Sequence, residues 1–121
     1  MYKVLAIDDE MEICKVIEAF LTKKGFCVLT AYSGEESLKI IEKEKPDLVV
    51  LDKRMPGIGG VAVLRELVKR KDSTPVIVLS GSEELSEHAE ELKDLGYDDI
   101  LIKPIDLKIL LERINKRLAG K

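Results

Sequence analysis

The chain has 121 residues, of which 45% are hydrophobic and 36% are charged, and its formal net charge is -3. This length suits one globular domain with a single core, expected to span residues 1–121, and the small net charge argues against bulk electrostatic binding to DNA or to anionic lipid. The apolar runs are too short to span a membrane, and the N-terminus turns acidic too early for a secretory signal.

Five short apolar runs alternate along the chain with five stretches of helical periodicity. The runs are rich in Val, Ile and Leu, and four of them are nearly continuous, which is typical of strands that are covered on both faces. In chain order they occupy residues 4–7, 26–31, 48–51, 76–79 and 100–102. The helical stretches occupy residues 13–21, 33–45, 61–68, 85–95 and 107–118.

Residues that commonly begin or end helices mark the boundaries of these stretches. Ser33, followed by Glu36, has the spacing of a capping box, and Asp106 is an expected N-cap. Gly25 and Gly96 follow the first and fourth helical stretches, where a glycine commonly ends a helix, and a proline follows the second.

This order of elements predicts an α/β fold of the (βα)5 type, a doubly wound, flavodoxin-like parallel sheet of five strands. Its crossovers are expected to be right-handed, with helices on both faces. In such a sheet the first, third, fourth and fifth strands can be neighbours, with the second at one edge, and ligands bind beyond the carboxyl ends of the strands. The residues that end the strands are therefore the first candidates for function.

Polar residues end four of the five strands: Asp8 and Asp9 the first, Asp52 the third, Ser80 the fourth and Lys103 the fifth. Three carboxylates at one rim oppose each other's ionisation, and a hard cation such as Mg²⁺ relieves this repulsion. Lys103 offers positive charge to a phosphoryl group, Ser80 offers a hydrogen bond, and Asp52 is a candidate nucleophile because carboxylates form aspartyl phosphates. The strand ends therefore suit phosphoryl chemistry, with Asp52 as the candidate nucleophile.

With these residues in place, the chain resembles the receiver domain of bacterial response regulators over nearly its whole length. The matching pieces are Asp8-Asp9, Asp52-x-x-Met55-Pro56-x-x-x-Gly60, Ser80-Gly81 and Lys103-Pro104. The resemblance implies the strand order 2-1-3-4-5, which is known for chemotaxis regulators. It also implies a cis peptide bond before Pro104, since X-Pro bonds tolerate that isomer.

The resemblance further implies a role for each site residue. Asp52 accepts a phosphoryl group from a phosphohistidine on a sensor histidine kinase or a phosphotransfer protein. Asp8, Asp9, Asp52 and the backbone carbonyl of Arg54 hold Mg²⁺ or Mn²⁺. Lys103 pairs with the phosphoryl group or with Asp52. Such a domain is not an enzyme acting on other molecules, because it catalyses only its own phosphorylation and dephosphorylation.

Output is expected at the face made by the fourth helix, the fifth strand and the fifth helix. In the family, Ser80 moves toward the phosphoryl group and biases this face toward a downstream protein target or an output domain. Acids at residues 83–94 and bases in the fifth helix (Lys108, Arg113, Lys116 and Arg117) could pair across a symmetric homodimer. We expect no direct contact with nucleic acid or membrane.

The resemblance also implies that the kinase docks at the first helix, with Met11, Cys14 and Lys15 beside the site. Cys14 and Cys27 form neither a CxxC motif nor a dense disulfide pattern, so we expect packed thiols and a cytoplasmic location. His88 is expected at the boundary between the fourth helix and the core. It is the sole histidine of the sequence, so a metal site built from several histidines is excluded.

Two positions depart from the family pattern. The family usually carries an aromatic residue three positions before the lysine, and here that position is Ile100, with Tyr97 three residues further away. The usual aromatic switch is therefore in doubt, although the phosphorylation chemistry does not need it. Arg54 occupies a position that tends to tune phosphoryl lifetime.

Each candidate residue also has a purely structural interpretation. Asp9 can be an N-cap, because Glu12 follows at the spacing of a capping box. Asp52 can begin a loop, Ser80 can belong to a turn and Lys103 can be a solvated surface lysine. The combination at neighbouring strand ends favours the functional interpretation.

Three other functions stay open at this point. Gly57-x-Gly59-x-x-Ala62 matches a relaxed dinucleotide-binding fingerprint, although these glycines lie beyond the strand end and behind Asp52. A phosphohydrolase with an aspartate nucleophile is the second alternative. That class requires a second aspartate two residues after the nucleophile, to protonate the leaving group, and this chain has Arg54 there. The third alternative is a receiver-shaped interaction module that is never phosphorylated, which the departure at Ile100 leaves possible.

Overall fold

The computed structural model describes residues 1–54, 59–81 and 85–119, with residues 85–88 described by their backbone alone. The five strands are β1 (Lys3–Ile7), β2 (Cys27–Ala31), β3 (Leu48–Asp52), β4 (Val76–Ser80) and β5 (Ile100–Ile102). The five helices are α1 (Met11–Lys23), α2 (Gly34–Glu44), α3 (Gly59–Lys69), α4 (Leu85–Leu95) and α5 (Leu107–Leu118). Every strand and helix expected from the apolar pattern is present, in the expected order.

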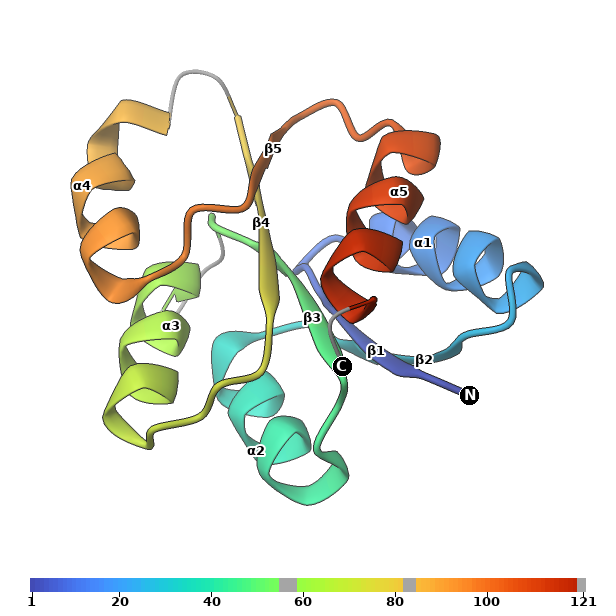
Figure 1. The fold of residues 1–121 in the computed structure, drawn as a ribbon, viewed down its shortest axis with the longest axis horizontal. Coiled ribbons are helices and arrows are strands. Elements are labelled where there is room, and N and C mark those ends of the chain that lie inside the picture. The colour runs from blue at the N-terminus through green and yellow to red at the C-terminus, as the bar shows by residue number, and fades with distance from the viewer. Residues whose placement is uncertain (55–58, 82–84, 120–121) are drawn as a thin grey trace.

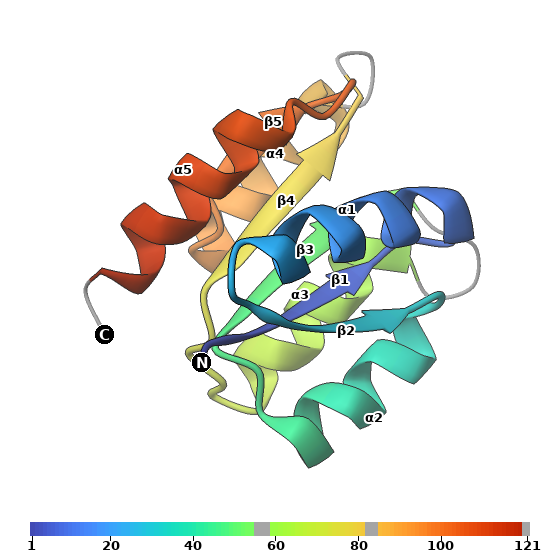
Figure 2. The same ribbon diagram turned by 90° about the vertical axis from the view of Figure 1, so that its right-hand side faces the viewer.

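All strand pairs are parallel, and the sheet has the order β2-β1-β3-β4-β5, which confirms the doubly wound α/β prediction. Helices α1 and α5 cover one face of the sheet, whereas α2, α3 and α4 cover the other (Figure 1). The view turned by 90° shows the same two layers of helices with the strands between them (Figure 2). None of these helices, within the described residues, has the length and apolar character that crossing a bilayer requires.

The continuous apolar runs are explained by the two cores, one on each face of the sheet. Successive side chains of a strand point to opposite faces. In β1, Leu5 and Ile7 therefore pack on the side of α2, α3 and α4, whereas Val4 and Ala6 pack on the side of α1 and α5. All five residues of β3 and of β4 are buried. Neither strand has a solvent-exposed face, so their sequences do not alternate between apolar and polar residues.

Two of the expected helix caps are confirmed. The Ser33 hydroxyl accepts a hydrogen bond from the Glu36 amide at 3.1 Å, and the Asp106 carboxylate accepts from the amides of Lys108 and Ile109. The capping box is altered in one respect, because the Glu36 carboxylate accepts from the Tyr32 amide rather than from that of Ser33.

The interpretation of Asp9 as an N-cap is wrong. Helix α1 begins at Met11, its N-cap residue is Glu10, and no side chain caps it. The Glu10 amide instead donates to Asp8 Oδ1 at 2.9 Å. Asp9 is therefore an exposed carboxylate that the start of the helix does not use.

Both cysteines are free, as expected. Cys14 is completely buried, and burial raises the pKa of its thiol to about 11, so the group stays protonated at neutral pH. Cys27 is only half-buried, on the edge strand β2.

Candidate functional site

The predicted site residues meet at the carboxyl ends of β1, β3, β4 and β5. The strand register brings these ends level, because Ile7 pairs with Leu51, and Asp52 pairs with Leu79. One carboxylate oxygen from each of Asp8, Asp9 and Asp52 lies within 4.8 Å of the others. The sheet therefore brings Asp52 beside Asp8 and Asp9, which lie more than forty positions earlier in the sequence.

Asp52 is the buried centre of this cluster, with 2% of its surface exposed. Its Oδ1 atom lies 3.0 Å from Lys103 Nζ and accepts a hydrogen bond from the Arg54 amide at 3.2 Å. The pairing of Lys103 with Asp52, one of the two that the resemblance implied, is therefore present in this structure. The backbone of Lys103 is also held in place, because its amide donates to the carbonyl of Ser80 at 2.8 Å.

The surroundings of Asp8 disfavour the ionised form of its carboxylate. Its side chain is buried, and none of the described residues donates a hydrogen bond to its Oδ2 atom. Burial, the largest cause, raises the pKa of Asp8 to about 7, and the charge of Asp52 adds to the rise. The Glu10 amide and Lys103 act in the opposite direction, but they do not cancel it.

The same carboxylates raise the pKa of Lys103. Burial lowers the pKa of the ammonium group, but the hydrogen bond and the charge of Asp52 outweigh this effect, with smaller contributions from Asp8 and Glu10. The net result is a raised pKa, so Lys103 stays positively charged at neutral pH. The Lys103 ammonium offsets only part of the negative charge of Asp8, Asp9 and Asp52, so this group of described side chains keeps an excess of negative charge.

This excess fits a hard divalent cation. The candidate side-chain ligand atoms are carboxylate oxygens, which Mg²⁺ prefers, and the unpartnered Oδ2 atom of Asp8 needs a positive partner. Asp9 is exposed and Asp8 and Asp52 are buried, so the cluster opens to solvent on one side. The carbonyl of Arg54 stays a predicted ligand, while its amide is already bound to Asp52.

Ser80 lies at the end of β4 with 1% of its surface exposed. Its hydroxyl donates to the carbonyl of the next residue, Gly81, at 3.2 Å. The hydrogen bond from Ser80 to a phosphoryl group therefore stays a prediction that requires this local bond to break.

The position of the missing aromatic residue is filled by aliphatic packing. Ile100 is partly buried and packs against the core beneath α2, α3 and α4, and Tyr97 is 9% exposed within the same core. Ile102, at the end of β5, is instead 42% exposed. Ile100 itself therefore occupies the position where the resemblance expects an aromatic residue, and Tyr97 packs within the core.

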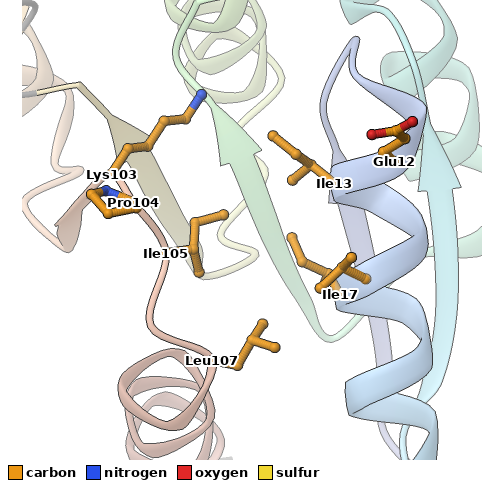
Figure 3. A pocket seen from close by; sticks show the side chains of 8 residues that line it. Glu12, Ile13, Ile17, Lys103, Pro104, Ile105 and Leu107 are labelled. Atoms are coloured by element: carbon orange, nitrogen blue, oxygen red, sulfur yellow. The ribbon is translucent and has the colours of Figure 1, made fainter.

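An apolar groove of about 370 Å³, which no sequence pattern predicted, adjoins the site. It is lined by Glu12, Ile13, Val16, Ile17, Lys103, Pro104, Ile105 and Leu107. Figure 3 shows Ile13 and Ile17 facing the segment that follows β5, while Lys103 extends from this segment toward the end of β3. The peptide bond between Lys103 and Pro104 is cis, as the resemblance implied.

The expected docking residues on α1 need one correction. Met11 and Lys15 are exposed, but Cys14 is completely buried beneath the helix and cannot touch a partner. Val16, in contrast, is 54% exposed and lines the groove, so it is accessible where Cys14 is not.

Some predictions fall outside the described residues. These are Met55, Pro56 and Gly57 of the loop after Asp52, the acids Glu83 and Glu84, and the side chains of Glu87 and His88. Within the described part of the glycine-rich loop, the Gly60 amide donates to the carbonyl of Lys53 at 3.1 Å. This amide is therefore used by the protein itself, which weakens the dinucleotide-binding alternative.

Comparisons with known proteins agree with this geometry. The family model of the response regulator receiver domain matches residues 4–115. The probable transcriptional regulator ycf27 of Porphyridium aerugineum is 41% identical over 116 residues, which are 96% of this chain and 48% of that protein. The alkaline phosphatase synthesis transcriptional regulatory protein PhoP of Bacillus subtilis is 37% identical over 112 residues, or 93% of this chain and 46% of that protein. The chain thus spans about half the length of the curated relatives it matches.

Solved structures show the same likeness over almost the complete chain. The receiver domain of a Francisella response regulator is 33% identical with a TM-score of 0.90, covering 99% of this chain and 98% of that chain. The response regulator protein TrrA of Thermotoga maritima, solved in complex with Mg²⁺ and BeF, is 33% identical with a TM-score of 0.84. The match covers 98% of this chain and 100% of the TrrA chain. From the sheet order, the cluster at its carboxyl edge and these matches, the chain belongs to the response regulator receiver domain family.

Proposed function

We propose that this receiver domain, as a single unit over residues 1–121, takes up a phosphoryl group on Asp52 with the help of a divalent cation. One observation carries the proposal: the buried Asp52 carboxylate lies 3.0 Å from the Lys103 ammonium, beside the carboxylates of Asp8 and Asp9. A carboxylate in this position is a nucleophile with a fixed cation next to it. TrrA, the similar protein solved with Mg²⁺ and BeF, supports the choice of metal.

In the proposed transfer, an Asp52 oxygen forms a bond to phosphorus while the bond between phosphorus and the donor's histidine nitrogen breaks. The leaving imidazole retains a proton and departs as a neutral group. Lys103 holds its charge next to the transferred oxygens, where negative charge must be neutralised. Ser80 can donate a hydrogen bond to the same group once it releases the carbonyl of Gly81.

Asp8, Asp9, Asp52 and the carbonyl of Arg54 would hold Mg²⁺ or Mn²⁺. When bound, the cation supplies charge that neutralises the carboxylates and the incoming phosphoryl oxygens. The protein contributes a preorganised cluster that needs no movement of β1 or β3 to form. Because the domain modifies only itself, it is not proposed as an enzyme acting on a separate substrate.

The proposed donor is a sensor histidine kinase or a phosphotransfer protein, and the groove between α1 and the segment after β5 is its proposed docking place. The groove is apolar, and Lys103 belongs both to its wall and to the phosphoryl site. A partner seated there would therefore bring its phosphohistidine next to Asp52. Met11 and Val16, at 52% and 54% exposed, offer apolar contacts on the same helix.

The proposed output runs through the face made by α4, β5 and α5, toward a downstream protein or an output domain. Ile102 and Ile109 are exposed apolar residues of β5 and α5, at 42% and 45%. Arg113 and Arg117, expected to pair across a homodimer, already pair with the buried Asp99 of their own chain. A homodimer through this face would therefore have to exchange some of these ion pairs.

The alternative is an interaction module that is never phosphorylated, favoured only by the aliphatic packing at Ile100. One experiment separates the two functions. The protein is incubated with acetyl phosphate, with and without Mg²⁺, and its intact mass is measured. We expect a phosphate adduct in the wild type with Mg²⁺, and none in Asp52→Asn, because the amide is not a nucleophile of this kind.

Asp98→Asn is the matched control, since Asp98 is an exposed aspartate close to β5, and it should behave as wild type. An adduct that forms equally well in Asp52→Asn, or without any divalent cation, would exclude the proposed mechanism. Absence of an adduct from the wild type under every condition would favour the interaction module.

A further inference from the structure

Gly60, the second residue of α3, lies directly against the backbone that carries Asp52. A Cβ atom added to Gly60 would lie 2.7 Å from the carbonyl oxygens of both Asp52 and Lys53, and 2.8 Å from the Lys53 Cα atom. These separations are well below the roughly 3.5 Å at which non-bonded heavy atoms pack. All three atoms belong to the main chain, which cannot rotate away as a flexible side chain can. Any residue other than glycine therefore forces the two backbones apart.

Backbone hydrogen bonds hold the two segments in this contact. The Gly60 amide donates to the Lys53 carbonyl at 3.1 Å, and the Lys53 amide donates to the Leu79 carbonyl at 2.9 Å. The first amides of a helix have no partner within the helix, so the Lys53 carbonyl satisfies one that would otherwise be unpaired. The peptide that follows Asp52 is thus fixed between β4 and the first turn of α3.

If a side chain were added at position 60, we expect the backbone after β3 to move rather than helix α3. Helix α3 is anchored to the core by the buried side chains of Val61, Val63, Leu64 and Leu67. The β3 strand, in contrast, ends at Asp52, the last residue of its pairing with β4. A side chain at position 60 would therefore displace the peptide between Asp52 and Lys53, and the Asp52 carboxylate with it.

We propose that Gly60 is a positioning residue for the phosphoacceptor: the absence of its side chain sets where the Asp52 carboxylate lies relative to Lys103 and the other two carboxylates. The consequence for phosphorylation rests on the proposed function, whereas the consequence for the Asp52 backbone does not. A displacement of about 1 Å at a reacting group can slow a reaction by about 100-fold, so a small shift has a measurable effect.

The test compares Gly60→Ala with Gly59→Ala. Gly59 is the matched control, because its φ of +74° makes alanine unfavourable there while no atom lies within 4 Å of an added Cβ. Three quantities are measured: the rate of phosphorylation by acetyl phosphate, the rise of Tm caused by Mg²⁺ alone, and the NMR shifts of the Asp52, Lys53 and Arg54 amides. A merely structural glycine would lower Tm with and without Mg²⁺ by the same amount.

For Gly60→Ala we expect phosphorylation slowed by about tenfold or more, a smaller rise of Tm with Mg²⁺, and displaced amide signals at all three positions. For Gly59→Ala we expect a lower Tm, while the rate, the Mg²⁺ effect and the three amides stay close to wild type. Wild-type rate and Mg²⁺ response in Gly60→Ala would overturn the inference, even if that variant were less stable.

If the wild type accepts no phosphoryl group, the proposed function fails, and the amide shifts and the Mg²⁺ response of Gly60→Ala still decide the positioning role. If Gly60→Ala does not fold in buffer, the measurements are repeated with trimethylamine N-oxide, which favours compact states. A variant that stays unfolded there would show that Gly60 is needed for the fold as a whole, which overturns the narrower positioning role.

Discussion

Asp8→Asn is expected to raise the free energy of unfolding of the metal-free protein at pH 8 by about 2–4 kcal/mol. Burial first, and then the charge of Asp52, raise the pKa of Asp8 from its ordinary value of 3.8 to about 7. At pH 8 the folded protein must nevertheless hold this carboxylate ionised, with no hydrogen-bond donor to Oδ2 among the described residues. The uncharged amide removes that cost.

The same pKa shift makes the stability of the wild type fall with pH. The unfolded chain releases the Asp8 proton near pH 3.8, whereas the folded protein keeps it up to about pH 7. Between these values the folded state binds more protons, so the free energy of unfolding falls as the pH rises from about 4 to about 7. Asp8→Asn should lack this part of the fall.

Denaturant unfolding at several pH values, with and without Mg²⁺, measures both effects. Mg²⁺ should stabilise the wild type at pH 8 and have little effect on Asp8→Asn, because a metal ligand is lost. Asp9→Asn separates the two effects. Because Asp9 is exposed, the stability of the metal-free protein should change little, while the stabilisation by Mg²⁺ is lost. Asp98→Asn should change neither quantity. Equal stabilisation of Asp8→Asn and wild type by Mg²⁺ would contradict the assigned metal ligand.

Lys103→Met is expected to slow phosphorylation by about 100- to 1000-fold, while Mg²⁺ binds the variant more tightly than the wild type. The ammonium lies 3.0 Å from Asp52 Oδ1, so it partly neutralises a carboxylate that the metal also needs. Without it, the metal meets a more negative cluster, but the transferred phosphoryl group loses its fixed cation. The two effects have opposite signs, which a general loss of structure would not produce.

Removal of Lys103 should also destabilise the metal-free protein by about 1–3 kcal/mol, because the buried Asp52 loses its charged partner. Mg²⁺ titration, acetyl phosphate kinetics and denaturant unfolding of the same preparation test the three expectations. Lys108→Met, at an exposed position in the first turn of α5, is the control and should match the wild type. Weaker Mg²⁺ binding by Lys103→Met would show that the lysine does not compete with the metal.

The sequence predicted most of the fold because its apolar pattern is so regular. Buried strands such as β3 and β4 have no polar face, so they read as unbroken runs of Val, Ile and Leu. The caps at Ser33 and Asp106 follow from local side-chain chemistry, which acts within three residues. The start of α1 was harder to place, because its N-cap, Glu10, provides no side-chain hydrogen bond and leaves no signal in the sequence.

The candidate site was predictable as far as it consists of strand ends. Parallel strands bring their carboxyl ends to one edge, so the sequence alone places Asp8, Asp52 and Lys103 together. The groove beside α1 could not be predicted, since it depends on how a helix and a distant segment approach each other. The close contact at Gly60 was equally hidden, because the sequence shows a glycine but not the carbonyl groups it faces.

Chemical trapping of the phosphorylated residue tests the central claim most directly. Borohydride reduces an acyl phosphate to an alcohol, so an aspartyl phosphate becomes homoserine, which mass spectrometry locates in a peptide digest. After treatment with acetyl phosphate and Mg²⁺, we expect homoserine at position 52 and at no other aspartate. Homoserine at position 8 or 9, or a phosphorylated protein with unmodified Asp52, would contradict the assignment of Asp52 as the phosphoacceptor.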